Sequence, residues 1–497
     1  MVSRRIFLTS GLAGLAGAGW AQAPETSLFP SPRPSSIALR TAPGIDTLVA
    51  DAGLGGRVGC AVADARTGEI LELHNGLLGL PPASVSKSVT CAYALRRLGP
   101  EFRFQTRVWA DGPLQNGRLD GDLWLEGGGD PLLVTDDING LAQQLAETGL
   151  REVTGDLRLA VGALPEVSQI DPDQPPHVGY NPSVGALNLN FNRIHFEWER
   201  SSQGYTVRMD ARSESIRPPI NRIGMRVIDR AAPVYTYRQA DGREEWTVAR
   251  SALGNGGSRW LPVRNPARYT AEVFQVLTRS RGLVLDTVRV GGRVPGDATL
   301  LAVHESPVLR EILRSMMRFS TNITAECSGL MASNAGGGSP GGLVASGGQM
   351  ARWMRDGLSA QNPRFVDHSG LGEESRLCAR DMASALVATG ADGQVRSLMR
   401  PFLMRDRDGR FIENHPVEVV AKTGTLNFVS TLAGFARAPS GRDLAFAIFC
   451  ADLPRRAALP DPQMERPDGG RAYNRRAKAL QQALIERWAQ VFGPSQG

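Results

Sequence analysis

The sequence predicts an α+β fold, in which one domain of helices and antiparallel strands is split by a large β-rich insertion. Near the start of the chain, residues 58–73 read as a strand, a turn and a second strand, and an apolar helix follows them. Residues 419–449 repeat the strand pattern near the other end. Between these regions, residues 102–300 are dominated by short strands, turns and polar loops. We therefore interpret the middle of the chain as an insertion.

The composition indicates a folded protein and gives little support for nucleic-acid binding. The chain has 497 residues, of which 42% are hydrophobic and 21% charged, a size sufficient for two or three domains. Its formal net charge of +6 falls to +4 when Arg4 and Arg5 are removed with the leader, and no run of lysine and arginine occurs. We therefore expect no nucleic-acid partner.

Residues 1–23 resemble an export signal. Arg4 and Arg5 precede a short apolar run that cannot span a bilayer as a stable helix. The Ser-Arg-Arg-x-Phe-Leu pattern is similar to a twin-arginine signal, and small residues fit cleavage after Ala21. An ordinary secretory signal and an uncleaved anchor are the alternatives. No later segment is long and apolar enough to span a membrane, so we expect no transmembrane segment in the mature chain.

The five cysteines and six histidines predict no metal site, because their spacings match no zinc pattern. Cys91 and Cys327 fall in predicted helices and are expected to be buried thiols. Cys60 and Cys450 fall in predicted strands and could be neighbours, but we assign no disulfide to them. The glycine run at 127–129 continues as Asp130-Pro131, which indicates a turn rather than a phosphate loop. We therefore expect no metal and no cofactor.

Residues 81–87, Pro-Pro-Ala-Ser-Val-Ser-Lys, predict a nucleophile at the start of a helix. The prolines suit a helix start, and Gly99-Pro100 ends the helix. Ser84 and Lys87 are three residues apart, so a helix brings them to one face. Serine needs a base to take its proton, and lysine serves when burial and a second cation depress its pKa. A lone Ser-x-x-Lys pair more often marks a solvated helix face, so a catalytic interpretation of this pair depends on the other motifs in the chain.

The middle region holds two further expected elements. Residues 186–192 are predicted as a strand, because apolar and polar side chains alternate from Leu187 onward. A helix is predicted to open at Asn265-Pro266 and to run through Arg279.

A second motif lies between two predicted helices. Ser306-Pro307 predicts the start of the first helix, with Ser306 as its cap, and this helix ends at Phe319. Residues 320–322, Ser-Thr-Asn, then form a short exposed connection. Another apolar helix follows and runs to about Ala332.

A third motif lies on a strand edge near the end of the chain. Residues 419–425 contain Lys422-Thr423-Gly424-Thr425, and two further strands joined by a turn at 439–442 continue the sheet. The last predicted helix, about 475–492, carries one apolar face. We expect this helix to pack on the sheet, and the alternative is a helix lying on a membrane surface.

These three motifs stand in an order and context that resemble a known family. The pairs Ser84-x-x-Lys87 and Ser320-x-Asn322 precede Lys422-Thr423-Gly424, a set found in penicillin-binding proteins and class A β-lactamases. Ser84 and Ser320 are 236 residues apart, and a compact β-lactamase has no room for an insertion of that length. The chain therefore resembles the class C penicillin-binding proteins, the D-Ala-D-Ala carboxypeptidase/endopeptidase family of the penicillin-binding protein 4 type. Residues 367–371, Asp-His-Ser-Gly-Leu, are similar to that family as well.

The resemblance implies a domain plan. A β-lactamase/transpeptidase-like domain, an antiparallel sheet with helices on both sides, would comprise residues 24–101 and 301–497. Residues 102–300 would form the insertion of one or two small domains, the second spanning 195–259 if there are two.

The resemblance also implies the roles of the site residues. Ser84 would attack the peptide carbonyl, Lys87 would take its proton, and Ser320 would pass a proton to the leaving amine with the help of Lys422. Asn322 would bind the substrate amide. The hydroxyls of Thr423 and Thr425, with Lys422 nearby, would bind a terminal carboxylate. Gly424 would belong to the same substrate-binding segment. The oxyanion hole would be formed by the backbone N–H groups of Ser84 and Thr425. Taken singly, each of these residues has a structural alternative, such as a helix cap for Ser320 and Asn322.

Three positions depart from the family pattern. Thr321 stands where the family more often has Asp or Asn, His368 replaces a usual glycine, and Gly372 replaces a usual serine. We expect these departures to change the cleft wall, and hence substrate preference, more than the chemistry.

The resemblance predicts an exported, periplasmic hydrolase of peptidoglycan stem peptides and cross-links, with β-lactam antibiotics as covalent inhibitors. A β-lactamase-like serine hydrolase shares the motifs and is one alternative, although the long insertion disfavours it. A catalytically silent wall-binding protein is the other. The joint presence of Ser84, Lys87, Ser320 and Lys422 argues against it.

Overall fold

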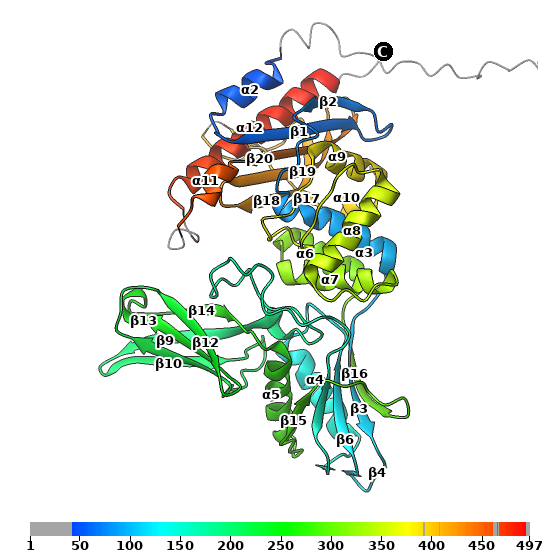
Figure 1. The fold of residues 1–497 in the computed structure, drawn as a ribbon, viewed down its shortest axis with the longest axis vertical. Helices are drawn as coiled ribbons and strands as arrows, with labels where there is room; N and C mark the ends of the chain where they lie inside the picture. Colours follow the sequence, from blue (N-terminus) through cyan, green and yellow to red (C-terminus); the bar gives the residue numbers. More distant parts are fainter. Residues whose placement is uncertain (1–41, 391–392, 407, 461–464, 466, 494–497) are drawn as a thin grey trace, which may run out of the picture.

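The computed structural model describes residues 42–390, 393–406, 408–460, 465 and 467–493. The predicted export signal, residues 1–23, lies outside the described residues. Figure 1 shows two parts along the long axis of the molecule. A helix-and-sheet domain contains both the first and the last described elements, and a β-rich part is formed by the middle of the chain.

The helix-and-sheet domain is built on a six-stranded antiparallel sheet with the order β17-β18-β19-β20-β1-β2. β1 pairs with β20 along its whole length, so the first and last long strands of the chain lie side by side. The strands of this sheet are β1 (Arg57–Asp64), β2 (Ile70–His74), β17 (Arg400–Pro401), β18 (Glu418–Leu426), β19 (Val429–Arg437) and β20 (Asp443–Ala451).

Helices cover both faces of this sheet (Figure 1). One face packs against α12 (Gly470–Phe492), beside which α2 (Ile45–Asp51) lies, and α12 buries Leu480, Leu484 and Trp488 there. The last helix therefore packs on the sheet, as expected. The opposite face is covered by the short turn η1 (Ala83–Val85) and by α3 (Ser86–Leu98), α6 (Leu309–Phe319), α7 (Asn322–Ala335), α8 (Leu343–Leu358), α9 (Ala379–Ala388) and α10 (Gln394–Leu398). The short α11 (Leu453–Ala457) follows β20.

The β-rich part contains a five-stranded sheet in the order β15-β8-β6-β3-β16. The helices α4 (Thr135–Glu147) and α5 (Pro266–Arg279) pack together beside it, and their apolar residues join one buried core with the sheet. The strands are β3 (Gln105–Asp111), β6 (Asp122–Gly127), β8 (Leu157–Ala160), β15 (Val288–Val290) and β16 (Thr299–Glu305). A minor sheet is formed by β4 (Leu114–Gln115), β5 (Arg118–Leu119) and β7 (Glu152–Val153).

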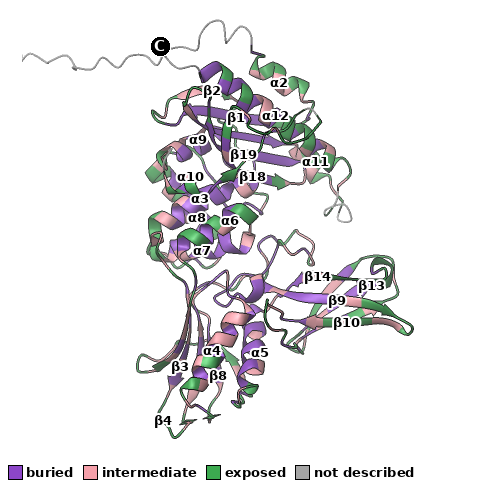
Figure 2. Cartoon of the chain, turned by 180° about the vertical axis from the view of Figure 1, so that it is seen from behind, coloured by how far each residue is buried: buried purple, intermediate pink, exposed green. Residues whose placement is uncertain are grey.

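Two three-stranded sheets form an arm beside this sheet (Figure 1). The first has the order β10-β9-β14 and the second β11-β13-β12. Their elements are β9 (Arg193–Ser201), β10 (Gly204–Asp210), β11 (Ile223–Ile228), β12 (Tyr235–Ala240), β13 (Arg243–Ala249), η3 (Arg250–Ala252) and β14 (Gly256–Pro262). Buried residues of the arm belong to the same core as the five-stranded sheet, as the purple interior in Figure 2 shows.

The predicted strand at 186–192 is wrong. This segment is a turn that ends in η2 (Leu189–Asn192), and Asn190, Phe191 and Asn192 have positive φ angles of 52°, 58° and 52°. Its asparagines are buried rather than exposed, because their amides hydrogen-bond the surrounding chain. The alternation of apolar and polar residues therefore came from buried amides and not from a solvated strand face.

Three other expectations about the elements need correction. Ser306 does not cap a helix: Val308 precedes α6, while the Ser306 hydroxyl accepts the backbone N–H of Phe104 over 2.9 Å. The insertion runs past residue 300, because β16 pairs with β3 as far as Glu305. The prediction that short strands, turns and loops dominate the insertion also missed a helix, α4. The helix predicted to run through Arg279 is present as α5.

All five cysteines are buried and free. Cys60 on β1 and Cys450 on β20 lie on adjacent strands and face the same core. They are not opposite each other, because Cys60 pairs with Ile448 and Cys450 pairs with Val58.

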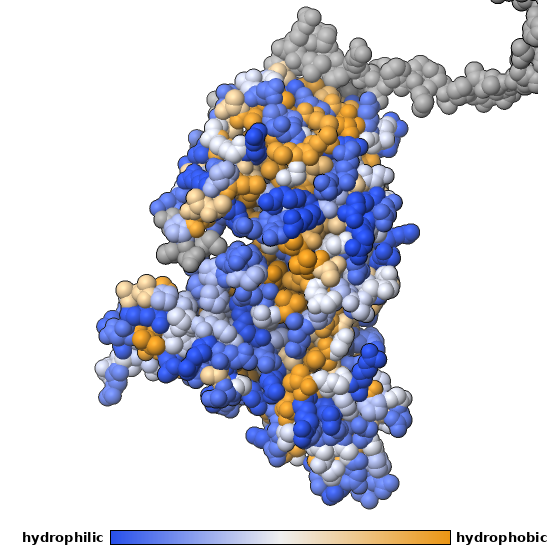
Figure 3. Space-filling view, viewed as in Figure 1, coloured by the Kyte–Doolittle hydropathy of each residue, from blue (hydrophilic) through white to orange (hydrophobic). Residues whose placement is uncertain are grey.

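Figure 3 shows hydrophilic residues spread over this face of both parts. Within the described part of the chain, no helix combines the length and the apolar character that crossing a membrane requires. In the same residues, no group of three histidines, cysteines and acids comes together to hold a metal ion.

Candidate active site

Ser84 lies in η1, the short turn that enters α3. Thr431 on β19 donates its hydroxyl to the Pro82 carbonyl over 2.8 Å and so fixes this turn against the sheet. Gly424 on β18 leaves room for the turn, because a Cβ there would lie 2.9 Å from the Ser84 nitrogen and would overlap the Thr431 hydroxyl. The glycine of the third motif is therefore required for the close approach of β18 to the serine.

Lys87 lies next to Ser84 and is fully buried. Its Nζ is 2.9 Å from Ser84 Oγ. The same Nζ lies 2.7 Å from Asn322 Oδ1 and 2.9 Å from the Ser369 carbonyl oxygen. The three acceptors come from η1, from the first residue of α7 and from the loop before α9, so they fix the position of the amine in three directions.

The surroundings of Lys87 favour its neutral form. Burial lowers the pKa of Lys87 to about 8, although the buried carboxyl groups of Glu326 and Asp367 act in the opposite direction. A neutral amine has two N–H donors and one lone pair. When Asn322 and Ser369 accept both N–H groups, the lone pair is directed at the hydroxyl of Ser84. This is the arrangement that proton abstraction from the serine requires.

Ser320 and Lys422 form a second contact across the site. Ser320 ends α6 in a left-handed conformation with a φ of 59°, and its Oγ accepts a hydrogen bond from Lys422 Nζ over 2.9 Å. Lys422 is 3% exposed. Burial, followed by the charges of Lys87 and Arg400, lowers the pKa of Lys422 to about 6.

The charges of the two lysines act in one direction. From the sequence, burial and a second cation were expected to depress the pKa of Lys87. In the structure, burial depresses the pKa of Lys87, and the charge of Lys87 helps to lower that of Lys422. Because Lys422 has already lost its proton near pH 8, it carries no charge in the range where Lys87 titrates.

Asn322 connects the lysine to the insertion. Its Oδ1 accepts from Lys87, and its Nδ2 donates to the Tyr180 carbonyl over 2.7 Å. One N–H of the amide is left for a substrate. The loop that carries Tyr180 belongs to the insertion, so the inserted part helps to build the site.

The outer edge of β18 is open beside the serine. β17 pairs only with Val420 and Ala421, so among the described residues no strand covers the edge of β18 from Lys422 to Leu426. Thr425 is exposed on this edge and Thr423 is half-buried. A peptide in extended conformation can add to such an edge as a further strand.

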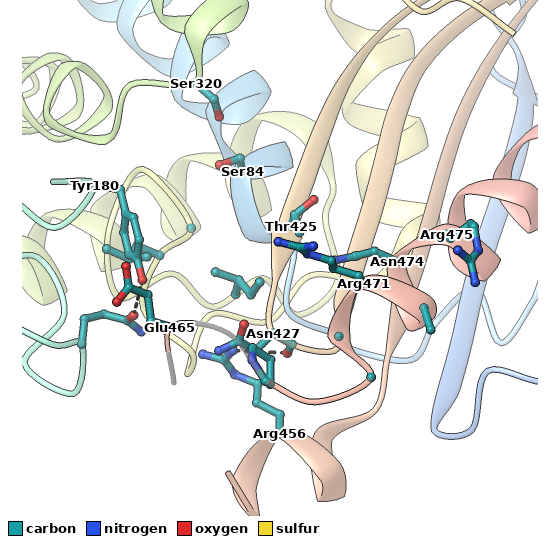
Figure 4. A pocket seen from close by; sticks show the side chains of 18 of the residues that line it. Ser84, Tyr180, Ser320, Thr425, Asn427, Arg456, Glu465, Arg471, Asn474 and Arg475 are labelled. Atoms are coloured by element: carbon teal, nitrogen blue, oxygen red, sulfur yellow. Dashed lines mark hydrogen bonds between the residues drawn. The ribbon is translucent and has the colours of Figure 1, made fainter. Parts of the chain in front are cut away.

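A cavity of about 830 Å³ opens over these residues. Figure 4 shows the hydroxyl groups of Ser84, Ser320 and Thr425 at one end, with Tyr180 of the insertion opposite β18. The farther walls come from the insertion, from the turn between β18 and β19, from α11, from the N-terminal turns of α12 and from the segment between these two helices. They include Gln174, Tyr180, Asn427, Arg456, Glu465, Arg471, Asn474 and Arg475. The contacts of Lys87 with Asn322 and of Lys422 with Ser320 thus bring the three motifs together beside this cleft.

Comparisons with known proteins agree with this geometry. Residues 42–463 match the sequence model of the D-Ala-D-Ala carboxypeptidase 3 (S13) family. The chain belongs to the S13 family.

Two relatives and one solved structure illustrate the similarity of this S13 chain. The D-alanyl-D-alanine carboxypeptidase of Actinomadura sp. (strain R39) is 30% identical over 442 residues, which cover 81% of this chain and 79% of the relative. D-alanyl-D-alanine carboxypeptidase DacB of Haemophilus influenzae is 26% identical over 415 residues, covering 80% and 85%. The crystal structure of penicillin binding protein 4 from H. influenzae superposes with a TM-score of 0.74 at 22% identity, covering 89% of this chain and 99% of that chain.

The predicted departures from the S13 pattern lie in different surroundings. His368 is fully buried and does not line the cleft. The expectation that this residue changes the shape of the cleft wall is therefore wrong. Thr321 precedes α7, and its hydroxyl donates to that of Thr324 over 2.8 Å. The backbone N–H of Gly372 donates to Asp367 Oδ2 over 2.6 Å.

Sequence reasoning missed Glu326, a buried acid under the S13 site. Its carboxylate accepts the backbone N–H groups of His368 and Ser369, each over 2.9 Å. Burial raises the pKa of Glu326 to about 8, and Asp367 acts in the same direction. The available signal was spacing: Glu326 follows Asn322 by one turn of α7 and so lies on the same face of that helix.

Proposed function

We propose that this protein is a serine D-Ala-D-Ala carboxypeptidase that also cleaves cross-link peptide bonds of peptidoglycan, with Ser84 as the nucleophile of an acyl-enzyme mechanism. The observation that carries the proposal is the contact of Ser84 Oγ with the buried amine of Lys87 in an open cleft. Membership of the S13 family and the names of the curated relatives support the substrate class.

Acylation begins when Ser84 Oγ attacks the carbonyl carbon of the scissile bond. Lys87 accepts the hydroxyl proton, and the carbonyl oxygen takes up the negative charge. The backbone N–H groups of Ser84 and Thr425 are suited to bind this oxyanion, because Gly424 lets β18 approach the Ser84 turn. A donor of this kind contributes typically about 3 kcal/mol to the stability of a transition state.

Collapse of the tetrahedral intermediate requires a proton on the leaving amine. Ser320 is placed to deliver its hydroxyl proton there and to regain one from the ammonium form of Lys422, which lies 2.9 Å away and which a bound substrate carboxylate stabilises. The C–N bond breaks, the amine leaves protonated, and an ester to Ser84 remains. Lys87 gives up the serine proton to solvent. As a neutral amine it then takes a proton from the water that attacks the ester, and it returns that proton to Ser84 Oγ when the ester bond breaks.

Recognition of the leaving group distinguishes the two activities. A terminal D-Ala carries a carboxylate, and Lys422 with the hydroxyls of Thr423 and Thr425 offers an anion site on β18. In a cross-link, the leaving amine belongs to a second stem peptide, which the open length of the cleft accommodates. β-Lactams acylate the same serine and act as covalent inhibitors in this proposal.

The proposed place of work is the periplasm. The support is sequence alone: residues 1–23 resemble an export signal of the twin-arginine type, and peptidoglycan lies outside the cytoplasm.

Labelling with a fluorescent penicillin tests this function against its alternatives. A stable label on the mature protein is expected for the proposed enzyme. Rapid loss of the label with turnover of the penicillin would instead indicate a β-lactamase-like hydrolase, and no label would indicate a silent wall-binding protein. Mass analysis of purified cell-wall fragments after incubation then gives the balance of carboxypeptidase and endopeptidase products.

A further inference from the structure

His368 is a large side chain buried under the catalytic lysine. Its ring is fully buried and inserts between α3, α7 and α8. The ring is stacked at 8° to that of Tyr93 on α3, with 6.4 Å between the ring centres. Its Nε2 lies 2.7 Å from Ser346 Oγ on α8, and its Nδ1 lies 3.4 Å from Met350 Sδ.

The space for this ring exists because α7 has a glycine at position 329. A Cβ on Gly329 would overlap the atoms of the His368 imidazole. The ring therefore packs directly on the backbone of α7, the helix that begins at Asn322 and carries Glu326. Gly329 and His368 are sterically complementary, so neither residue can be enlarged without displacing the other.

A closed set of buried side chains holds the ring by hydrogen bonds. Tyr93 Oη lies 3.1 Å from Ser333 Oγ, which lies 2.7 Å from Ser346 Oγ. Ser346 contacts His368 Nε2. Burial lowers the pKa of His368 to about 3, so the ring is neutral at pH 7. Because an unpaired buried polar group is costly, this set fixes the position of the ring.

The backbone of the same segment holds Lys87. The His368 carbonyl accepts from Thr90 Oγ1 over 2.6 Å, and the next carbonyl, that of Ser369, accepts from Lys87 Nζ over 2.9 Å. The Glu326 carboxylate accepts the backbone N–H groups of the same two residues, His368 and Ser369. A shift of the imidazole would therefore move the Ser369 oxygen, which is one of the acceptors that direct the lone pair of Lys87 at Ser84.

We propose that His368 is a positioning residue for the acylation step, whose ring, seated on Gly329, holds the Ser369 carbonyl at hydrogen-bonding distance from Lys87. The inference rests on the proposed function, because it needs Lys87 as the base for Ser84. His368 itself touches neither the substrate nor the nucleophile. Other charged or titratable groups near Lys87 are Glu326, Asp367, Lys422 and Cys91.

The test measures the hydrolysis of a synthetic tripeptide ending in D-Ala-D-Ala by the mature protein. In His368→Ala we expect kcat to fall at least about tenfold while KM stays within about twofold, because small displacements of a reacting group lower the rate more than the binding. His368→Gln keeps a polar group that can reach Ser346, and it is expected to retain more of the rate. Gly329→Ala adds one methyl group against the ring and is expected to lower kcat as well.

The double variant His368→Ala/Gly329→Ala isolates the contact between the two residues. We expect it to be no slower than His368→Ala alone, because the added methyl group then has no ring to displace. Leu386→Ala is the matched control: Leu386 is buried on α9 in the same core, where α9 packs on the sheet. It should lower the melting temperature and leave kcat unchanged.

Two results would overturn the inference. One is an unchanged kcat in His368→Ala and Gly329→Ala, with losses of melting temperature like that of Leu386→Ala. The other is a double variant whose rate loss equals the product of the two single losses. An active wild type with unaffected variants overturns this inference alone, whereas a wild type that neither hydrolyses the tripeptide nor binds penicillin overturns the proposed function and this inference together.

Discussion

Lys422 Nζ and Ser320 Oγ meet across the cleft at 2.9 Å, and this contact joins β18 to the turn between α6 and α7. The pair sits beside Lys87 and Ser84, which meet at the same distance on η1 and α3. The site therefore contains two serine–lysine pairs, of which one is suited to activate the nucleophile and the other to protonate the leaving group.

Ser84→Ala is expected to abolish covalent labelling by a fluorescent penicillin, because it removes the only atom proposed to form the ester. The change deletes one oxygen from a turn held by the backbone contact to Thr431, so the melting temperature should change little. Ser88→Ala is the matched control. Ser88 lies on α3, the helix that follows the Ser84 turn, and its buried hydroxyl has no hydrogen-bond partner among the described residues. Covalent label on Ser84→Ala would exclude this serine as the nucleophile.

The rate of acylation is expected to rise with pH up to about 8 and then to level off. Lys87 must be neutral to accept the serine proton, and its pKa is lowered by burial to about 8. The neutral fraction of Lys87 therefore grows as the pH rises from 7 to 9, and the rate should increase over this range. Stopped-flow labelling with penicillin over this range measures the effect. A rate that stays constant or falls between pH 7 and 9 would contradict the role of Lys87.

The motifs could be predicted from the sequence because their geometry is local. Ser84 and Lys87 meet since they are one helical turn apart. The strand carrying Lys422 and Gly424 was found from its own residues, and so was the connection that holds Ser320. The order of the three motifs indicated that these segments meet, and the structure places them in one cleft.

The remaining parts of the site could not be predicted because they depend on tertiary contacts. Ser369 holds Lys87 with a backbone carbonyl from a position 282 residues away, and a carbonyl leaves no signature in the sequence. The turn at 186–192 was misread because the pattern of a half-exposed strand was produced by buried amides such as Asn188 and Asn192. His368 was placed on the cleft wall because the space that Gly329 leaves below the loop is visible only in the fold.

Replacement of Arg4 and Arg5 by lysine is expected to retain the precursor in the cytoplasm if the leader is of the twin-arginine type. The paired arginines are the feature that such a signal requires, and both positions precede the described residues. Cell fractionation followed by penicillin labelling of each fraction measures the distribution. Replacement of Arg33 or Arg40 by lysine in the same precursor is the control, since both lie after the predicted cleavage site. Unchanged export would point to the general secretory route.

Lys422 is expected to gain a proton when a substrate with a terminal carboxylate binds. Its pKa in the free enzyme is lowered to about 6, so at pH 7.5 most molecules carry a neutral Lys422. A carboxylate beside Thr423 and Thr425 favours the ammonium form and raises this pKa. Binding should therefore take up a proton at pH 7.5. Below pH 6 the uptake should vanish, because Lys422 is then already charged. Affinity for the carboxylate should weaken as the pH rises through the pKa of the complex.

Calorimetry measures this proton uptake with Ser84→Ala, which binds the peptide without consuming it. Titration in two buffers of different ionisation enthalpy is expected to show uptake of a fraction of a proton for a D-Ala-D-Ala peptide and none for its C-terminal amide. Lys422→Ala in the same background should abolish the difference.

In the active enzyme, Lys422→Ala should reduce activity on the acid more than on the amide, because a charge-assisted hydrogen bond is roughly twice as strong as a neutral one. With the amide, which leaves Lys422 neutral, the pH at which acylation levels off should stay near 8, since a neutral Lys422 exerts no repulsion on Lys87. Equal uptake with both peptides would show that the proton binds elsewhere, and equal loss on both would leave Lys422 without a role in carboxylate recognition.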